Sequence, residues 1–138
     1  GCALTADMIT GFPGETEADQ AAAVAFLEQV GFAAVHVFPY SRRPGTKADA
    51  MPEQLSHAVK SARAHEAQRV ADACQQRYLV QPVGQTLPVL FETEHDGSWV
   101  GHSDNYCLVR AAGDDLRGLV KNVKISAVSG QMLVGDLV

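Results

Sequence analysis

Asp7-Met8-Ile9-Thr10-Gly11-Phe12-Pro13-Gly14-Glu15-Thr16 is the stretch that decides the fold. It closes a short apolar strand, predicted over residues 4–10, and then turns through glycine and proline into a helix. Thr16 has the side chain of a helix N-cap, and Gly31 is suited to end the same helix. A second apolar strand is predicted over 32–38. Strand, helix and strand at this spacing predict a βαβ unit with two buried parallel strands joined by a right-handed crossover.

The pattern changes twice downstream of this unit. A loop over 39–52 is rich in proline, glycine and basic residues, and a helix is predicted from residue 52 or 56 to residue 78. Val70, Cys74 and Tyr78 form an apolar stripe on this helix at spacings of four. Helical periodicity then gives way to short strands separated by turn signals. They are expected over 86–93, 98–101, 105–110, 118–126 and 131–138, which indicates a small closed barrel of the OB-like or SH3-like type.

Composition excludes several classes of protein. An apolar fraction of 46% and a charged fraction of 20% are ordinary for a soluble globular chain. The apolar runs are too short to span a membrane, and residues 1–4 do not resemble a signal peptide, so a cytoplasmic location is expected. The net charge of −5 does not favour nucleic acid, so any RNA contact must rest on a local patch. Cys2, Cys74 and Cys107 are too far apart in sequence for a metal motif and are expected to be small, partly buried thiols.

The glycine turn over residues 11–16 admits three interpretations. It lacks the lysine of a P-loop and the three-glycine spacing of a dinucleotide motif, but backbone amides around Gly14 and Thr16 could bind a phosphate. The acidic side chains of Glu15 and Glu17 oppose that. An apolar shelf from Ile9 to Pro13 would suit a purine ring, which needs stacking area and one or two hydrogen bonds. The third interpretation is that the glycines serve only a tight strand-to-helix turn.

A second candidate edge follows the second strand. Four residues lie just beyond its carboxyl end, where open α/β sheets bind their ligands: Tyr40, Arg42, Arg43 and Thr46. This composition fits contact with a phosphate backbone or a stacked base, or else a solvated loop that happens to carry two arginines. His36 falls inside the strand and is expected to be a buried core histidine.

These segments resemble the C-terminal part of the radical SAM methylthiotransferases. The residues that carry the resemblance are 5–16 and 36–48, the latter reading His-Val-Phe-Pro-Tyr-Ser-Arg-Arg-Pro-Gly-Thr-Lys-Ala. Residues 83–86, 101–106 and 135–137 resemble the TRAM domain of the same family, a small RNA-binding β-barrel. Within the family, the stretch from His36 looks most like the branch that acts on N6-threonylcarbamoyladenosine at position 37 of tRNA.

The resemblance implies a fold and a reaction. The fold would be α/β plus all-β: a partial radical SAM barrel with a linking helix over 1–80, then a five-stranded TRAM or OB-like barrel over 81–138. The parent enzyme would use S-adenosylmethionine and two [4Fe–4S] clusters to methylthiolate C2 of the modified adenine, with one S-adenosylmethionine as the source of a 5′-deoxyadenosyl radical and a second as the methyl donor. Its partner would be the anticodon stem-loop of tRNA.

The resemblance also implies roles for particular residues. One edge of the S-adenosylmethionine site would be formed by Ile9, Gly11, Phe12, Pro13, Phe38 and Pro39. Contacts with RNA would come from Tyr40, Arg42, Arg43, Asn105, Tyr106, Arg110, Lys121 and Lys124, although the lysines equally suit an ordinary solvated strand face. No catalytic residue and no metal ligand is expected within this chain.

The chain departs from the family pattern in ways that limit these expectations. The C-x3-C-x2-C cluster motif is absent, so the chain is expected to start inside the radical SAM domain, to be inactive alone, and to depend on an N-terminal remainder of the same protein. His102 and Cys107 replace residues that are usually basic or apolar, which weakens the expected RNA contact. An incomplete sheet would also expose apolar surface and favour self-association. The alternatives are a non-catalytic RNA-binding module, or a methylthiotransferase acting on isopentenyladenosine or a ribosomal protein.

Overall fold

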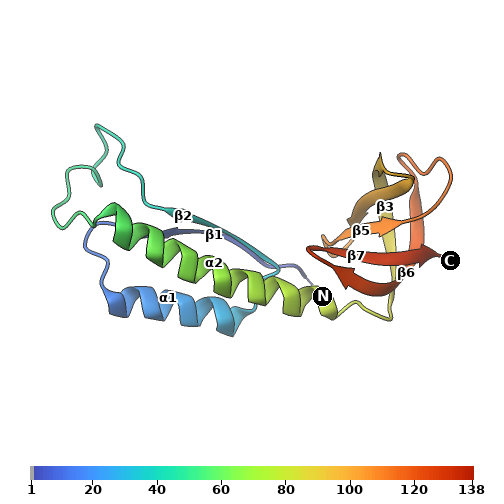
Figure 1. Cartoon of the computed structure of the whole chain (residues 1–138), viewed down its shortest axis with the longest axis horizontal. Helices are drawn as coiled ribbons and strands as arrows, with labels where there is room; N and C mark the ends of the chain where they lie inside the picture. Colours follow the sequence, from blue (N-terminus) through green and yellow to red (C-terminus); the bar gives the residue numbers. More distant parts are fainter. Residues whose placement is uncertain (1) are drawn as a thin grey trace. The chain divides into compact units, whose positions relative to one another are not determined.

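Two compact units make up the chain in the computed structural model, which describes residues 2–138 (Figure 1). One unit covers Leu4–Gln75, and the other covers Gln76–Val138 together with Cys2 and Ala3. Within the described range, no helix is both long enough and apolar enough to cross a membrane.

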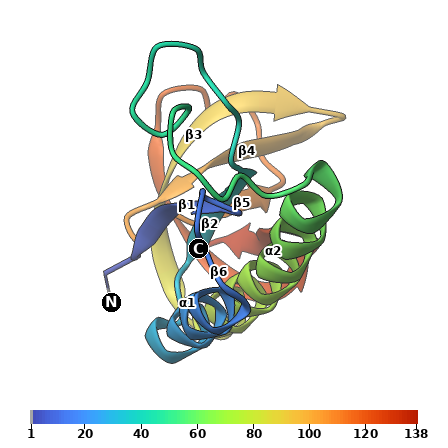
Figure 2. The same ribbon diagram turned by 90° about the vertical axis from the view of Figure 1, so that its left-hand side faces the viewer.

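The first unit is a two-stranded parallel sheet covered on one face by helices. Its elements are β1 (Thr5–Thr10), α1 (Glu17–Val30), β2 (Ala34–Pro39) and most of α2 (His57–Val80). β1 and β2 pair in parallel, with Ile9 opposite Phe38. Both helices lie on the same side of this sheet (Figures 1 and 2). The predicted βαβ unit with a parallel strand pair is therefore present.

The ends of α1 are fixed by the residues that the sequence predicted. The Thr16 hydroxyl accepts a hydrogen bond from the Asp19 backbone N–H at 3.2 Å, and the Asp19 carboxylate accepts one from the Thr16 N–H at 2.9 Å. This reciprocal pair satisfies two amides that the first turn leaves unbonded. At the other end Gly31 adopts φ of +68° and its N–H bonds to the Leu27 carbonyl. These caps set the helix length.

The prediction that both strands are buried on both faces is wrong. Only the face toward the helices is covered, in a core that contains Leu27, Val35, Ala67, Val70, Ala71 and Cys74. On the opposite face Ile9 is 58% exposed and Phe38 is 52% exposed. The side chain of Phe26 on α1 is 57% exposed as well. Among the described residues the sheet has two strands and a single covering layer, so one apolar face is left open to solvent.

The long helix α2 begins at the later of its two predicted starts. The hydroxyl of Ser56 accepts a hydrogen bond from the Val59 backbone N–H at 3.3 Å, and the helix starts with the next residue, His57. Its predicted stripe is largely confirmed, because Val70 and Cys74 are buried and Tyr78 packs against the core of the second unit.

The second unit is a closed five-stranded barrel, as the sequence predicted. Its strands are β3 (Thr86–His95), β4 (Ser98–Ser103), β5 (Leu108–Ala111), β6 (Val120–Ser129) and β7 (Met132–Leu137), in the order β3-β4-β5-β7-β6, and β6 closes on β3. The core is centred on Phe91, Ile125 and Leu133. A Cβ on Gly101 would collide with the backbone of Leu90, so this glycine permits the close approach of β3 and β4.

One strand boundary in the barrel differs from the prediction in a way that affects the candidate site. Asn105 and Tyr106 were predicted to start a strand, but β5 begins at Leu108 and these two residues form the turn after β4. The backbone of Tyr106 has φ of +64°, which no β-strand residue adopts. The side chains of this turn therefore project from a loop rather than from the barrel wall.

Candidate functional site

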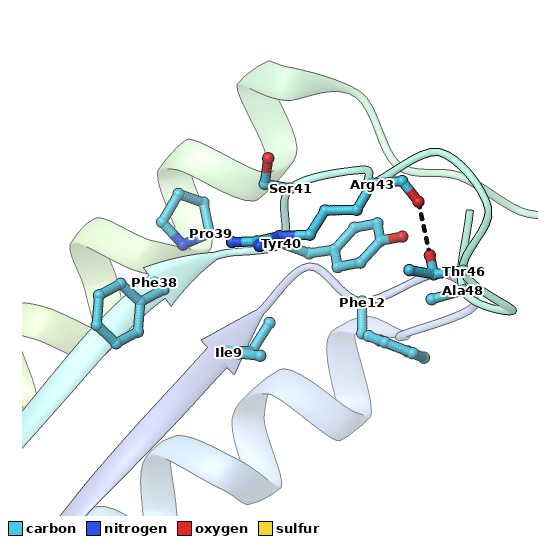
Figure 3. A pocket seen from close by; sticks show the side chains of 9 residues that line it. All are labelled: Ile9, Phe12, Phe38, Pro39, Tyr40, Ser41, Arg43, Thr46 and Ala48. Atoms are coloured by element: carbon cyan, nitrogen blue, oxygen red, sulfur yellow. Dashed lines mark hydrogen bonds between the residues drawn. The ribbon is translucent and has the colours of Figure 1, made fainter.

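A pocket of about 570 Å³ lies at the carboxyl ends of β1 and β2 (Figure 3). It is lined by Ile9, Phe12, Phe38, Pro39, Tyr40, Ser41, Arg43, Thr46 and Ala48. Four of the six predicted cofactor residues are thus brought together, along with Tyr40 and Arg43 from the predicted RNA contacts. The lining contains no carboxylate, histidine or cysteine, so this surface is built to bind and orient a ligand rather than to transfer protons.

The two remaining cofactor candidates do not line the pocket. Gly11 and Pro13 are buried. Gly11 has φ of +69°, and a Cβ there would lie 2.5 Å from Cγ of Lys60 on α2. Glycine therefore permits both the left-handed turn and the close packing of that turn against the helix.

A charged network holds the turn to α2. Both carboxylate oxygens of Glu15 lie 3.0 Å from the Gly11 nitrogen and accept its N–H. Arg63 Nη1 lies 2.7 Å from Glu15 Oε1 and 2.9 Å from the Glu15 carbonyl oxygen. Both side chains are largely buried, with 12% of Arg63 and 15% of Glu15 exposed. Gln20 adds bonds to the Arg63 carbonyl and to Glu66.

These contacts argue against a phosphate site on the glycine turn. The N–H of Gly14 donates to the Glu53 carbonyl, and the N–H of Glu15 donates to the Phe12 carbonyl. The N–H groups of Gly11 and Thr16 are bonded to carboxylates, as described above. Amides that already have protein acceptors are not available to an anion. Of the three interpretations of this turn, the apolar shelf agrees best with the geometry.

Tyr40 is a packed wall of the pocket. Its ring meets the Phe12 ring edge to face at a centroid distance of 5.3 Å, and Lys60 Nζ lies 5.6 Å from its centroid. Its hydroxyl oxygen is buried and has no hydrogen-bond partner among the described residues, and neither has the Thr10 hydroxyl. Buried polar groups without partners are uncommon. Of these two hydroxyls, that of Tyr40 belongs to a residue that lines the pocket, whereas Thr10 is fully buried and does not line it.

The two predicted arginines differ in environment. Arg42 pairs with Asp49, with Nε 2.7 Å from Oδ1, and does not line the pocket. Arg43 lines the pocket, and in Figure 3 its side chain runs back toward Pro39. Its carbonyl accepts a hydrogen bond from Thr46 at 2.8 Å, which tightens the loop around the pocket rim.

His36 was predicted to be buried in the core, and this is wrong. The residue is exposed on the open face of the sheet, with its ring 6.4 Å from the Phe38 ring and nearly parallel to it. The error follows from the missing second layer, because alternate residues of β2 face away from the helices. Thr46, predicted at this edge, lines the pocket, and so do Ser41 and Ala48, which the sequence did not mark because no local pattern indicates how the loop closes.

The five predicted RNA-contact residues of the barrel do not form one cluster. Asn105 and Tyr106 lie on the β4–β5 turn, Arg110 on β5, and the two lysines on β6. β7 lies between β5 and β6 in the barrel order, so Arg110 and the lysines are separated. Lys124 Nζ bonds to the Gly84 carbonyl. The side chain of Asn105 accepts from the Ser103 hydroxyl at 2.6 Å, and its backbone carbonyl accepts from the Tyr78 hydroxyl.

The cysteines lie in separate environments. Cys74 and Cys107 are buried, as expected, whereas Cys2 is exposed. Burial raises the pKa of the Cys107 thiol and also raises the pKa of the Tyr78 hydroxyl. Within residues 2–138, no three His, Cys, Asp or Glu side chains are grouped closely enough to hold a metal ion. Buried thiols of raised pKa are poor nucleophiles, which indicates a packing role for Cys107.

Comparison with known proteins identifies relatives. No family model matches the chain. It is 37% identical over 131 residues to threonylcarbamoyladenosine tRNA methylthiotransferase MtaB of Bacillus subtilis, an alignment covering 91% of the chain and 29% of that protein. It is 41% identical over 138 residues to the tRNA-2-methylthio-N(6)-dimethylallyladenosine synthase of Maricaulis maris, covering 98% and 30%. The synthase of the same name from Nitratidesulfovibrio vulgaris is 36% identical over 142 residues, covering 96% and 32%.

These alignments fix what the chain is related to. The chain spans less than a third of the length of the curated relatives that it matches. The match lies in their C-terminal region, in agreement with the motifs around the glycine turn and the β4–β5 turn. The resemblance drawn from those motifs is confirmed: this chain is a homologue of the C-terminal region of the tRNA methylthiotransferases.

Proposed function

We propose that this chain is the C-terminal portion of an enzyme that methylthiolates C2 of N6-threonylcarbamoyladenosine at position 37 of tRNA. In this proposal the first unit supplies one edge of the S-adenosylmethionine site and the barrel contributes to tRNA binding. The observation that carries the proposal is the pocket at the ends of β1 and β2, in a chain homologous to tRNA methylthiotransferases.

The pocket residues fit an adenine ring. Ile9, Phe12 and Phe38 present apolar surface that is 40% to 58% exposed, and apolar faces of this kind pack well against a planar base. The unpartnered hydroxyl of Tyr40, which lines the pocket, offers a hydrogen bond beside that surface. When bound, S-adenosylmethionine supplies the radical and the methyl group of the family reaction. The residues of this chain would hold the ligand, orient it and exclude water from it.

The first unit would be part of a larger radical SAM barrel. β1 and β2 pair with each other and with no further strand among the described residues, so each has a free edge. Their outward face is apolar at Ile9 and Phe38, as expected where more of a barrel is to pack. The two iron–sulfur clusters would be held outside this chain, because its cysteines lie apart and are not grouped with other ligand residues. We expect the parent enzyme in the cytoplasm, where tRNA is modified.

For tRNA binding, the proposed contacts are the side chains predicted from the sequence. They are Tyr40, Arg42 and Arg43 in the first unit, and Asn105, Tyr106, Arg110, Lys121 and Lys124 in the barrel. Tyr40 packs against the Phe12 ring and Arg42 is ion-paired with Asp49, which reduces what these two residues offer to RNA and leaves Arg43 as the strongest of the three.

A second candidate substrate is supported by the relatives. The two synthases named for dimethylallyladenosine are 36% and 41% identical to the chain. The relative named for threonylcarbamoyladenosine is 37% identical, which lies between these values. Identity therefore does not select the base. The His-Val-Phe-Pro-Tyr-Ser stretch from His36 favours threonylcarbamoyladenosine by its resemblance to that branch.

Mass spectrometry of tRNA nucleosides tests the proposal. The full-length protein that contains this chain is expressed in a host that lacks its own methylthiotransferases. Formation of 2-methylthio-N6-threonylcarbamoyladenosine is the expected result. The corresponding isopentenyl nucleoside would select the second candidate. If tRNA is unmodified and ribosomal proteins gain a methylthio group, the substrate assignment is wrong.

A pair of matched variants tests the role of the pocket. Phe38→Ala removes the ring that faces the pocket, whereas Phe26→Ala removes a similarly exposed ring on α1, outside the pocket. We expect Phe38→Ala to raise the S-adenosylmethionine concentration needed for half-maximal activity, and Phe26→Ala to leave it unchanged. Equal effects of both variants would contradict the assignment of the pocket.

A further inference from the structure

The β4–β5 turn of the barrel exposes the aromatic side chain of Tyr106 to solvent. The backbone of this residue is in a strained conformation. Tyr106 is 77% exposed, and its φ of +64° lies in the left-handed region that glycine and asparagine adopt more readily. The turn is nevertheless well fixed. The Tyr106 N–H donates to the Ser103 carbonyl at 3.0 Å, and the Ser103 hydroxyl bonds to Asn105 and Cys107. None of these hydrogen bonds uses the Tyr106 ring, so the fold of the turn does not require a large aromatic side chain at this position.

A second exposed ring lies beside it. The ring centroid of His102 is 5.6 Å from that of Tyr106, with 41° between the ring planes. His102 Nδ1 lies 2.6 Å from Glu92 Oε2, which orients the imidazole ring from β3. The two rings therefore stand together on the barrel surface, with the imidazole held by Glu92 and the backbone of Tyr106 held by the turn.

We propose that His102 and Tyr106 form a stacking site for one unpaired nucleobase of RNA. The proposal rests on the tRNA partner proposed above and adds where, and by which chemistry, the barrel binds it. Every base has a π face, so aromatic rings bind unpaired bases with little regard to sequence, whereas the bases of a duplex are already stacked on one another.

The charges around the pair favour a base over a phosphate. The carboxylate of Glu92 contacts His102, and Asp104 lies in the same turn between His102 and Tyr106 in sequence. Acidic groups repel a phosphate backbone but leave the ring faces available. The acidic net charge of the chain, which opposes general nucleic-acid binding, is compatible with a contact made by stacking.

The test compares two RNA probes on the whole 138-residue chain. One probe is a labelled RNA stem-loop with unpaired loop bases, and the other is a fully paired duplex of the same length. Fluorescence anisotropy at fixed salt should show tighter binding of the stem-loop. Tyr106→Asn should weaken that binding by about 5-fold to about 150-fold, the range that loss of one base–aromatic stack produces. Tyr106→Phe, which keeps the ring, should bind as the unmodified chain does.

Two further variants separate stacking from other causes. Tyr106→Asn suits the left-handed backbone, so its thermal unfolding midpoint should equal or exceed that of the unmodified chain, which excludes misfolding as the reason for weaker binding. His102→Gln keeps a polar side chain but removes the ring, so it should also weaken binding. Val138→Ala, a truncation at a residue that is 74% exposed, is the neutral control.

Three results would overturn this inference. The first is equal binding of stem-loop and duplex by the unmodified chain. The second is unchanged stem-loop affinity in Tyr106→Asn or full affinity in His102→Gln. The third is failure of the unmodified chain to bind either probe. The proposed enzymatic function would be judged separately, by the nucleoside analysis of the full-length protein, so its failure and the failure of the stacking site are distinguishable.

Discussion

The carboxylate of Glu15 bonds at once to the backbone of Gly11 and to the guanidinium of Arg63, 48 positions further along the chain. One side chain thereby ties the glycine turn, and the pocket that the turn borders, to helix α2. The link is charged and largely shielded from solvent, so it is stronger than a surface ion pair.

Loss of this link should loosen both the fold and the pocket. We expect Arg63→Ala to lower the free energy of unfolding by about 2–3 kcal/mol, because it leaves a largely buried carboxylate without its charged partner. Chemical denaturation of the 138-residue chain measures the change. Arg42→Ala is the matched control: it breaks the Arg42–Asp49 pair, in which Arg42 is 56% exposed, and should cost at most about 1 kcal/mol. Equal losses of unfolding free energy in the two variants would show that the Glu15–Arg63 pair contributes no more to stability than a surface ion pair.

Gly11 should tolerate no side chain. In Gly11→Ala the new methyl group meets Lys60, with 3.1 Å to its Cα as well as 2.5 Å to its Cγ, and the backbone is left-handed. We expect a loss of about 2–4 kcal/mol in the free energy of unfolding. Gly45→Ala is the control, since Gly45 also has a positive φ, of +85°, but open space around it. It should lose about 1 kcal/mol, the left-handed strain alone. A Gly11→Ala variant no less stable than Gly45→Ala would contradict the packing described here.

The capping box of α1 should lose its stabilising effect in acid. Hydrogen bonds from the Thr16 backbone and hydroxyl lower the pKa of Asp19 below its ordinary value of 3.8. A carboxyl group whose pKa is lower in the folded state stabilises the fold above its unfolded pKa, and this contribution is lost as the pH falls through the folded pKa. Thermal unfolding of the unmodified chain and of Asp19→Asn should therefore differ at pH 7 and converge as the pH falls below 3.8 and through the lowered pKa of Asp19. A difference that persists unchanged in acid would rule out the carboxylate as the source.

The open face of the sheet should drive self-association of the 14.7 kDa chain. Ile9 and Phe38 are paired neighbours on this face, and both are more than half exposed. Light scattering at rising protein concentration should show species heavier than a monomer. Phe38→Lys should shift the population toward monomer, while Phe26→Lys, on α1, should have less effect. A monodisperse monomer at high concentration would refute this expectation.

Much of the fold could be predicted because its signals are local. The caps at Thr16 and Gly31 and the turn signals between the barrel strands are each set by a few neighbouring residues, and the structure places helix and strands accordingly. The error at Asn105 and Tyr106 arose because the left-handed turn depends on hydrogen bonds from Ser103 that no local pattern indicates. The error at His36 arose because an apolar strand gives no sign of how many layers will cover it.

By itself, the sequence determined the parallel βαβ unit, the closed barrel and the relationship to methylthiotransferases, because periodicity, capping and short motifs are encoded over spans of a few residues. The tertiary structure alone decided that Glu15 and Arg63 would meet, that the loop after Tyr40 would close a pocket with Ile9 and Phe12, and that His102 would stand beside Tyr106. Each of these contacts joins segments that are distant in the sequence and that are brought together by packing and hydrogen bonding. Burial then decides which of their polar groups have a hydrogen-bond partner.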